Sequence, residues 1–155
     1  MTVIGITRTP RKLEHFDQIC AYADVLKVVK ELDYLVVLAP YPPENEGIVN
    51  ANVFAAMKES AFLINLSRGK VIDDEALISS LTNGEIAGAG LDVFALEPLP
   101  KLSPFWDLDN VIITPHMGGM SEDYVKQAMQ VVEHNLQAYL ENDFGRMINK
   151  VMRYD

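Results

Sequence analysis

The chain has 155 residues, of which 49% are hydrophobic and 23% are charged, a balance typical of a globular protein. Its 13 basic and 22 acidic residues give a net charge of −9, which argues against binding to nucleic acid or to an anionic membrane surface. Cys20 is the only cysteine, which excludes an intrachain disulfide, and no apolar stretch approaches the ~20 residues of a membrane-spanning helix.

We expect one soluble domain over residues 1–155, in a reducing and cytoplasmic setting. Met1 leads almost directly into a strand-like run, which is not the pattern of a secretory signal peptide. No break in composition marks a linker, and no internal repeat is present. The length is sufficient for one hydrophobic core.

Five short apolar runs are typical of buried parallel strands, because turn residues bound them and helical patterns separate them. They cover residues 3–7, 34–38, 61–65, 86–91 and 111–114. The fourth run contains Gly88 and Gly90, which permit close approach to the backbone, so we predict a central strand beside a site. A sheet that lacks its first strand would leave an unpaired edge at the first run.

Helical patterns lie between these strands. Asn50 is a suitable N-cap, and the carboxylates of Asp73 and Asp74 favour a helix start because they complement the helix dipole. The predicted helices cover residues 27–32, 51–57, 73–81 and 121–140. The last helix carries an apolar stripe that we expect to dock on the sheet or on a partner subunit. The alternation of strands and helices predicts a doubly wound, mostly parallel α/β fold of the Rossmann type.

An arginine, a glutamate and a histidine each lie in a turn that follows an apolar run: Arg68, Glu97 and His116. In parallel sheets, ligands bind at the carboxyl ends of the strands. A cation, an acid and an imidazole collected there suit an anionic substrate that undergoes proton transfer. Each residue taken singly fits an ordinary turn or surface position, so the hypothesis depends on the three together.

Three motifs around these residues resemble the signatures of the D-isomer-specific 2-hydroxyacid dehydrogenases. They occupy residues 65–77 (NLSRGKVIDDEAL), 87–100 (AGAGLDVFALEPLP) and 110–119 (NVIITPHMGG). The resemblance covers nearly the whole chain. It implies that residues 1–155 are part of an NAD(P)-binding domain, in an oxidoreductase that transfers a hydride between NAD(P)H and a small 2-oxo or 2-hydroxy acid.

The resemblance also implies a role for each of the three residues. Arg68 would grip the substrate carboxylate and 2-oxo group, a task that suits a planar, permanently charged guanidinium. Glu97 would hydrogen-bond the imidazole of His116, and His116 would be the general acid/base. The physical reason is that a neighbouring carboxylate favours the imidazolium and keeps a proton available near neutral pH.

For the cofactor, NAD or NADP, the resemblance implies a set of groove-lining residues from several loops: Arg8, Pro40, Asn45, Leu66, Ser67, Asp92 and Gly118. Arg8 follows the first strand, where an acid would bind the ribose hydroxyls of NAD. An arginine there can accommodate the 2′-phosphate of NADP, so both cofactors stay open. The chain has no metal-ligand spacing among its three histidines and one cysteine, and we predict no metal.

The family's first strand and phosphate-binding turn are not represented in the chain, because no G-x-G-x-x-G occurs in it. We therefore expect a sheet without its first β-α unit, and a chain without the separate substrate domain. A homodimer is implied by the resemblance. Two alternatives stay open: a non-catalytic dinucleotide-binding or dimerisation module, like the corepressors of this fold, and an unrelated Rossmann-like enzyme such as a methyltransferase, which would not need Glu97 or His116.

Overall fold

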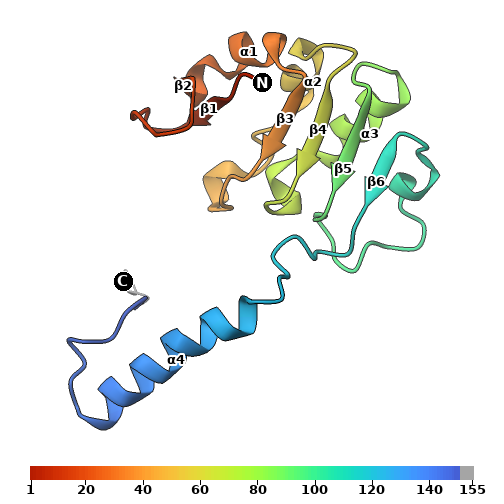
Figure 1. Cartoon of the computed structure of the whole chain (residues 1–155). Coiled ribbons are helices and arrows are strands. Elements are labelled where there is room, and N and C mark those ends of the chain that lie inside the picture. The colour runs from red at the N-terminus through yellow and green to blue at the C-terminus, as the bar shows by residue number, and fades with distance from the viewer. Residues whose placement is uncertain (151–155) are drawn as a thin grey trace. The chain divides into compact units, whose positions relative to one another are not determined.

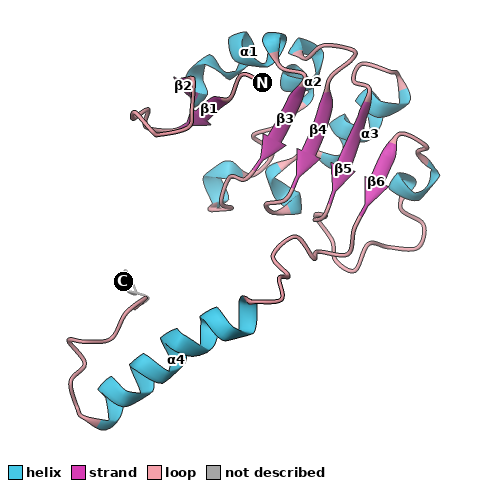
Figure 2. Cartoon of the chain, in the orientation of Figure 1, coloured by secondary structure: helices cyan, strands magenta, loops and turns pink. Residues whose placement is uncertain are grey.

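A computed structural model describes residues 1–150 of the chain. The chain forms two compact units, Met1–Gly118 and Gly119–Asp155. The larger unit is an α/β structure with parallel strands, which confirms the predicted fold class (Figure 1). The smaller unit holds helix α4 (Tyr124–Leu140) and the segment that follows it (Figure 2). The last five residues of the predicted domain 1–155 lie outside the described residues.

Six strands form two parallel sheets in the larger unit. A four-stranded sheet has the order β3-β4-β5-β6, and its strands are β3 (Tyr34–Val37), β4 (Phe62–Asn65), β5 (Gly88–Leu91) and β6 (Val111–Ile113). A two-stranded sheet pairs β1 (Ile4–Thr7) with β2 (Gln18–Ala21). The five predicted strands are confirmed, and β5 is an interior strand as expected.

Strand β2 was not predicted from the sequence. Its four residues, QICA, follow a polar stretch and are too few to show a clear alternation. It pairs in register along the whole of β1, from Ile4 opposite Gln18 to Thr7 opposite Ala21. Within residues 1–150, β2 is the one strand that pairs with β1.

The helices of the larger unit are short: α1 (Val25–Val28), α2 (Ala51–Ala56) and α3 (Asp74–Thr82). The side chain of Asn50 accepts a hydrogen bond from the amide of Asn52 and caps α2 as predicted. Asp73 caps α3, because its carboxylate accepts from the amide of Ala76 at 3.1 Å. Helix α3 therefore begins at Asp74, one residue later than predicted, and Asp73 is its N-cap.

The core of the larger unit joins the four-stranded sheet to these helices. Phe54 from α2, Leu63 from β4 and Leu77 from α3 are all nearly inaccessible to solvent. Burial of each such side chain contributes about 2 kcal/mol to stability. Along β3 the exposure alternates, with Leu35 and Val37 buried, so this strand packs against the core through one face.

In the smaller unit, the segment after α4 folds back on that helix. The ring of His134 contacts the backbone carbonyl of Arg146, and Asn135 exchanges two hydrogen bonds with the backbone of Ile148. Ala138 is fully buried by this packing. No helix within residues 1–150 combines the length and the apolar character that a bilayer crossing requires.

Candidate active site

The turn after β4 is ordered by a buried asparagine. Asn65 is 1% exposed, and its Oδ1 accepts hydrogen bonds from both the amide and the hydroxyl of Ser67. Its Nδ2 donates to the carbonyl of Arg68. This network fixes the backbone that carries Arg68, whose guanidinium donates to the Ser67 carbonyl and is otherwise solvent-accessible. Asn65 was not predicted to have this role, although a polar residue at the end of an apolar strand is a signal for it.

Glu97 and His116 form a close pair between two loops. Oε2 of Glu97 lies 2.7 Å from Nδ1 of His116, while Oε1 accepts a hydrogen bond from the amide of Phe94. The hydrogen bond with His116, followed by that from Phe94, lowers the pKa of Glu97 below its usual range despite partial desolvation. An ionised Glu97 accepts a hydrogen bond from the N–H group at Nδ1, so Nε2 is the imidazole atom left for a substrate.

His116 is held in a turn by the carboxylate of Asp92 at the end of β5. Oδ1 accepts from the hydroxyl of Thr114 at 2.5 Å and from the amide of Met117, and Oδ2 accepts from the amide of Gly118 at 2.8 Å. Asp92 is 3% exposed. Burial alone raises the pKa of Asp92, but these hydrogen bonds outweigh burial and lower the pKa overall.

The backbone of His116 itself is strained. Its φ angle is +53°, in the left-handed region that most residues with a Cβ avoid. Such conformations persist only where the surrounding structure imposes them, and they cluster at functional sites. Here the hydrogen bonds to Asp92 from the residues on both sides of His116 impose the turn.

Arg68, Glu97 and His116 line one cavity of about 260 Å³, so the structure brings the three predicted catalytic residues together. The loops after three neighbouring strands, β4, β5 and β6, supply them. Two further side chains that were not assigned to this site from the sequence, Tyr41 and Lys70, also line the cavity. Lys70 adds a second cation beside Arg68, which favours anionic ligands.

Gly69 fixes the relation between the Arg68 turn and the loop that carries Glu97. A Cβ atom at this glycine would lie 1.8 Å from the carbonyl carbon of Phe94 and 2.2 Å from the amide nitrogen of Ala95. Only a residue without a side chain permits this backbone contact. The close approach therefore places the turn of Arg68 directly against the start of the Glu97 loop.

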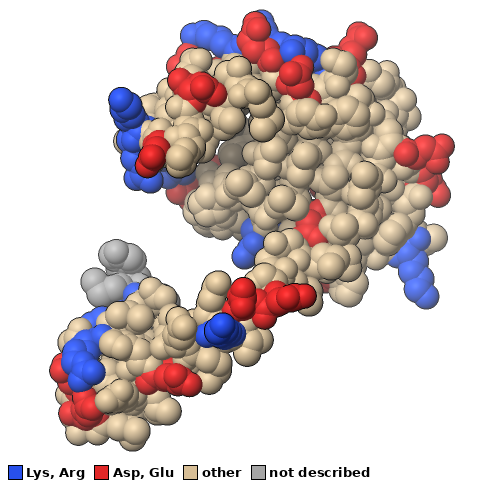
Figure 3. Space-filling model, viewed as in Figure 1, with Lys and Arg blue, Asp and Glu red and all other residues tan. Residues whose placement is uncertain are grey.

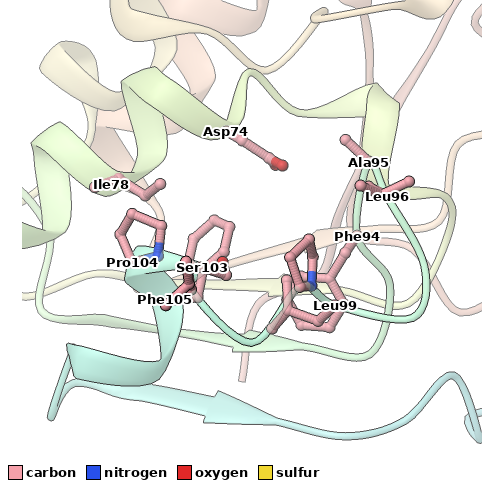
Figure 4. Close-up of a pocket in the computed structure, with 11 residues that line it drawn as sticks. Asp74, Ile78, Phe94, Ala95, Leu96, Leu99, Ser103, Pro104 and Phe105 are labelled. Carbon is pink, nitrogen blue, oxygen red and sulfur yellow. The ribbon is translucent and has the colours of Figure 1, made fainter.

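A second cavity of about 320 Å³ lies on the other side of that loop, between α3 and residues 94–105 (Figure 4). Most of its lining is apolar and includes Phe94, Leu99 and Phe105. Asp74 is its acidic group, and burial raises the pKa of this carboxyl. Phe94 and Ala95 line both cavities and so form the wall between them.

The predicted cofactor residues all follow the carboxyl ends of strands, and two of them meet across the two sheets. Arg8, after β1, donates from Nη1 to Oε1 of Glu44 at 3.3 Å and from Nη2 to Oδ1 of Asn45 at 3.2 Å. Asn45 in turn donates to the carbonyl of Pro40. The guanidinium therefore donates to one carboxylate oxygen and one amide oxygen of the same loop.

The other predicted cofactor residues are arranged around β4, β5 and β6. Leu66 is half exposed, whereas Ser67 is buried and its hydroxyl donates to Asn65. A Cβ on Gly118 would lie 3.0 Å from Oδ2 of Asp92 and 3.6 Å from Leu66, so these three residues are neighbours. The backbone at Gly118 thus lies close to the carboxyl ends of β4 and β5, where we expect the cofactor.

Charged side chains of both signs are interspersed on the face of the molecule seen in Figure 3, without a continuous basic patch. Among residues 1–150, no group of three or more histidine, cysteine, aspartate or glutamate side chains is placed to hold a metal ion.

A family model for the NAD binding domain of D-isomer specific 2-hydroxyacid dehydrogenases matches residues 1–118, the whole of the larger unit. The chain belongs to this family. The predicted resemblance and the predicted class of cofactor, NAD or NADP, are thereby confirmed.

Relatives of this chain include glyoxylate/hydroxypyruvate reductase B of Salmonella newport and D-3-phosphoglycerate dehydrogenase of Synechocystis. The chain is 41% identical to the first over 115 residues and 42% identical to the second over 122 residues. These matches cover 74% and 77% of the chain but 36% and 22% of the relatives. The chain therefore spans well under half the length of either relative.

A solved structure of a D-isomer specific 2-hydroxyacid dehydrogenase from Xanthobacter autotrophicus Py2, in complex with NADPH and MES, has the same fold. Its TM-score is 0.83 at 35% sequence identity, over 97% of this chain and 60% of that one. That dehydrogenase was crystallised with the phosphorylated form of the cofactor, which is one of the two forms predicted for this chain.

Proposed function

We propose that this chain supplies the catalytic residues for the reversible reduction of a small 2-oxo acid to a 2-hydroxy acid with NADH or NADPH. The observation that carries the proposal is the 2.7 Å contact between Glu97 and His116 in a cavity that Arg68 also lines. Two relatives named for glyoxylate, hydroxypyruvate and 3-phosphoglycerate support this class of substrate.

Arg68 binds the substrate in this proposal. Its guanidinium makes one hydrogen bond, to the Ser67 carbonyl, among the described residues, which leaves donors for a carboxylate and a 2-oxo group. Bound NADH or NADPH supplies the hydride to the 2-carbon. The cation then also stabilises the negative charge that develops on the 2-oxygen.

His116 moves the proton. Protonated at Nε2, it donates to the developing alkoxide during reduction and accepts the proton during oxidation. Glu97 acts as a positioning residue, because it holds Nδ1 and stabilises the imidazolium. The turn built on Asp92 fixes where the ring sits.

The decisive test is His116→Asn, compared with His15→Asn as the matched control. Both histidines have a positive φ angle, which asparagine tolerates, so neither change adds backbone strain. NADH and NADPH oxidation are measured with glyoxylate, hydroxypyruvate and pyruvate. The chain is assayed alone and in a hybrid in which it replaces the matching segment of the Salmonella reductase.

We expect at least about a 100-fold loss of turnover in the hybrid for His116→Asn and none for His15→Asn. Dinucleotide affinity, measured by fluorescence of the reduced nicotinamide, should stay unchanged in both variants. Equal turnover in the two variants would remove His116 from the mechanism. Cofactor binding without any turnover in the parent hybrid would favour the dinucleotide-binding module instead.

Glu97→Gln tests the pair by its pH dependence. The hydrogen bond with His116 holds the pKa of Glu97 below its ordinary value, so replacing the carboxyl by an amide, which carries no charge, should change the pH profile of reduction. Turnover in the hybrid is measured from pH 5 to pH 9, with Glu75→Gln, on the exposed side of α3, as the control. A profile that matches the parent's would contradict a working Glu97–His116 pair.

The proposal also includes the cytoplasmic homodimer that the family resemblance implied. Sedimentation equilibrium of the purified chain measures its assembly directly. A monomer at all concentrations would contradict a dimer formed by this chain alone.

A further inference from the structure

The carboxyl ends of β1 and β3 belong to different sheets, and the side chains of Arg8 and Glu44 join them. Arg8 follows β1, whereas Glu44 and Asn45 lie in the short 3₁₀ turn η3 (Pro43–Asn45) after β3. The Nη1–Oε1 and Nη2–Oδ1 distances are 3.3 and 3.2 Å. Both oxygen atoms that accept hydrogen bonds from the guanidinium therefore come from one loop.

This contact is exchangeable, because it is exposed to solvent. The side chains of Arg8 and Glu44 are 66% and 56% accessible. Exposed single ion pairs contribute little to stability, since water and salt screen them. A phosphate dianion can form two charge-assisted hydrogen bonds to an arginine and so compete with one carboxylate.

The side-chain amide of Asn45 is fixed more firmly than the carboxylate of Glu44. Asn45 donates from Nδ2 to the carbonyl of Pro40 at 2.8 Å, which orients its Oδ1 toward Arg8. The other acid of the same loop, Glu46, has a different partner, because the hydroxyl of Tyr41 donates to it at 2.9 Å. Glu44 is therefore the carboxylate of this loop that competes for the guanidinium.

We propose that Glu44 is a specificity-determining residue that weakens the preference of this chain for the 2′-phosphate of NADP. Its carboxylate pairs with the guanidinium of Arg8 when no phosphate is bound. When a phosphate takes its place, the negative charge of Glu44 repels that phosphate and weakens its binding. This inference rests on the proposed function, since it assumes that the adenosine end of the cofactor lies at the carboxyl ends of β1 and β3.

The probes are adenosine 2′,5′-bisphosphate and 5′-AMP, which differ only in the 2′-phosphate. Their affinities for the full chain are measured by NMR titration at millimolar concentrations and low salt. Glu44→Gln should strengthen binding of the bisphosphate about threefold to fivefold and leave 5′-AMP unchanged. Arg8→Gln should remove most of the difference between the two probes, and Glu46→Gln, the matched control, should change neither affinity.

A second readout follows the Glu44 carboxyl directly. Hydrogen bonds from its own backbone amide and from Arg8 hold the pKa of Glu44 below its usual value. When the bisphosphate takes Arg8 and adds negative charge, that pKa should rise, whereas 5′-AMP should leave it unchanged. The carboxyl carbon chemical shift, followed against pH, measures this change.

The inference is overturned if Glu44→Gln leaves the ratio of the two affinities unchanged or lowers it, or if neither probe binds. Failure of the proposed function is a separate result. A shifted ratio together with full turnover by His116→Asn would reject the role of His116 and leave that of Glu44 intact.

Discussion

The turn after β6 and the loop after β1 each carry a side chain with a proposed function, His116 and Arg8, at the carboxyl end of a parallel strand, but the two are held in different ways. The turn that carries His116 is anchored on Asp92, which is 3% exposed and accepts three hydrogen bonds. Arg8 is held by an ion pair whose partners are 66% and 56% exposed. The turn of His116 is thus anchored on a buried group, whereas Arg8 is held only by an exposed contact.

This difference has a physical reason. Proton transfer requires an imidazole whose position does not vary, so strain and buried hydrogen bonds are tolerated there. Phosphate recognition requires a cation that is free to leave one anion for another. Screened surface contacts serve that purpose because they cost little to break.

Gly69→Ala should disturb the reacting end most. The new Cβ would lie within 2.2 Å of the backbone of Phe94 and Ala95, which cannot yield as a side chain would. We expect a loss of about 3 kcal/mol in the free energy of unfolding, measured with urea. Gly90→Ala is the control, because its nearest neighbour lies at 4.0 Å. Equal stabilities of the two variants would show that the close approach is not rigid.

Asp92→Asn should have the next largest effect. An amide cannot accept hydrogen bonds at both of its terminal atoms, so the N–H group of Met117 or of Gly118, both part-buried, loses its partner, at a cost of about 2 kcal/mol. Urea unfolding measures this loss, with the exposed Asp109→Asn as the control. A similar stability for both variants would contradict the anchoring role.

The same variant has a pH signature. The pKa of Asp92 in the folded protein lies below its ordinary value, which it takes in the unfolded chain. The charged carboxylate therefore stabilises the fold fully at a pH above that ordinary pKa. This contribution is lost as the pH falls through the lower native pKa. The free energy of unfolding should therefore depend less steeply on acid pH in Asp92→Asn than in the parent.

Glu44→Gln should have the smallest effect on stability. The ion pair with Arg8 is exposed, so we expect the melting temperature to stay within error of the parent's at physiological salt. Differential scanning fluorimetry checks this, with Glu46→Gln alongside. A marked fall in melting temperature would mean that the contact holds the two sheets together and is not exchangeable.

Local pattern alone determined much of this protein. Turn residues around apolar runs located five of the six strands, and the caps at Asn50 and Asp73 marked two helices. Three motifs identified the family and pointed to Arg68, Glu97 and His116. These features depend on residues that are close together in the sequence, so they can be recognised from one sequence without its structure.

Only the tertiary structure decided how distant residues meet. The pairing of β1 with β2, the contact of Gly69 with Phe94, and the bonds from Asp92 to the His116 turn join segments that no local pattern connects. The contact between Arg8 and Glu44 is of the same kind, because Glu44 lies 36 residues away along the chain. Packing and electrostatics act through space, so their partners are fixed by the fold and not by spacing in the sequence.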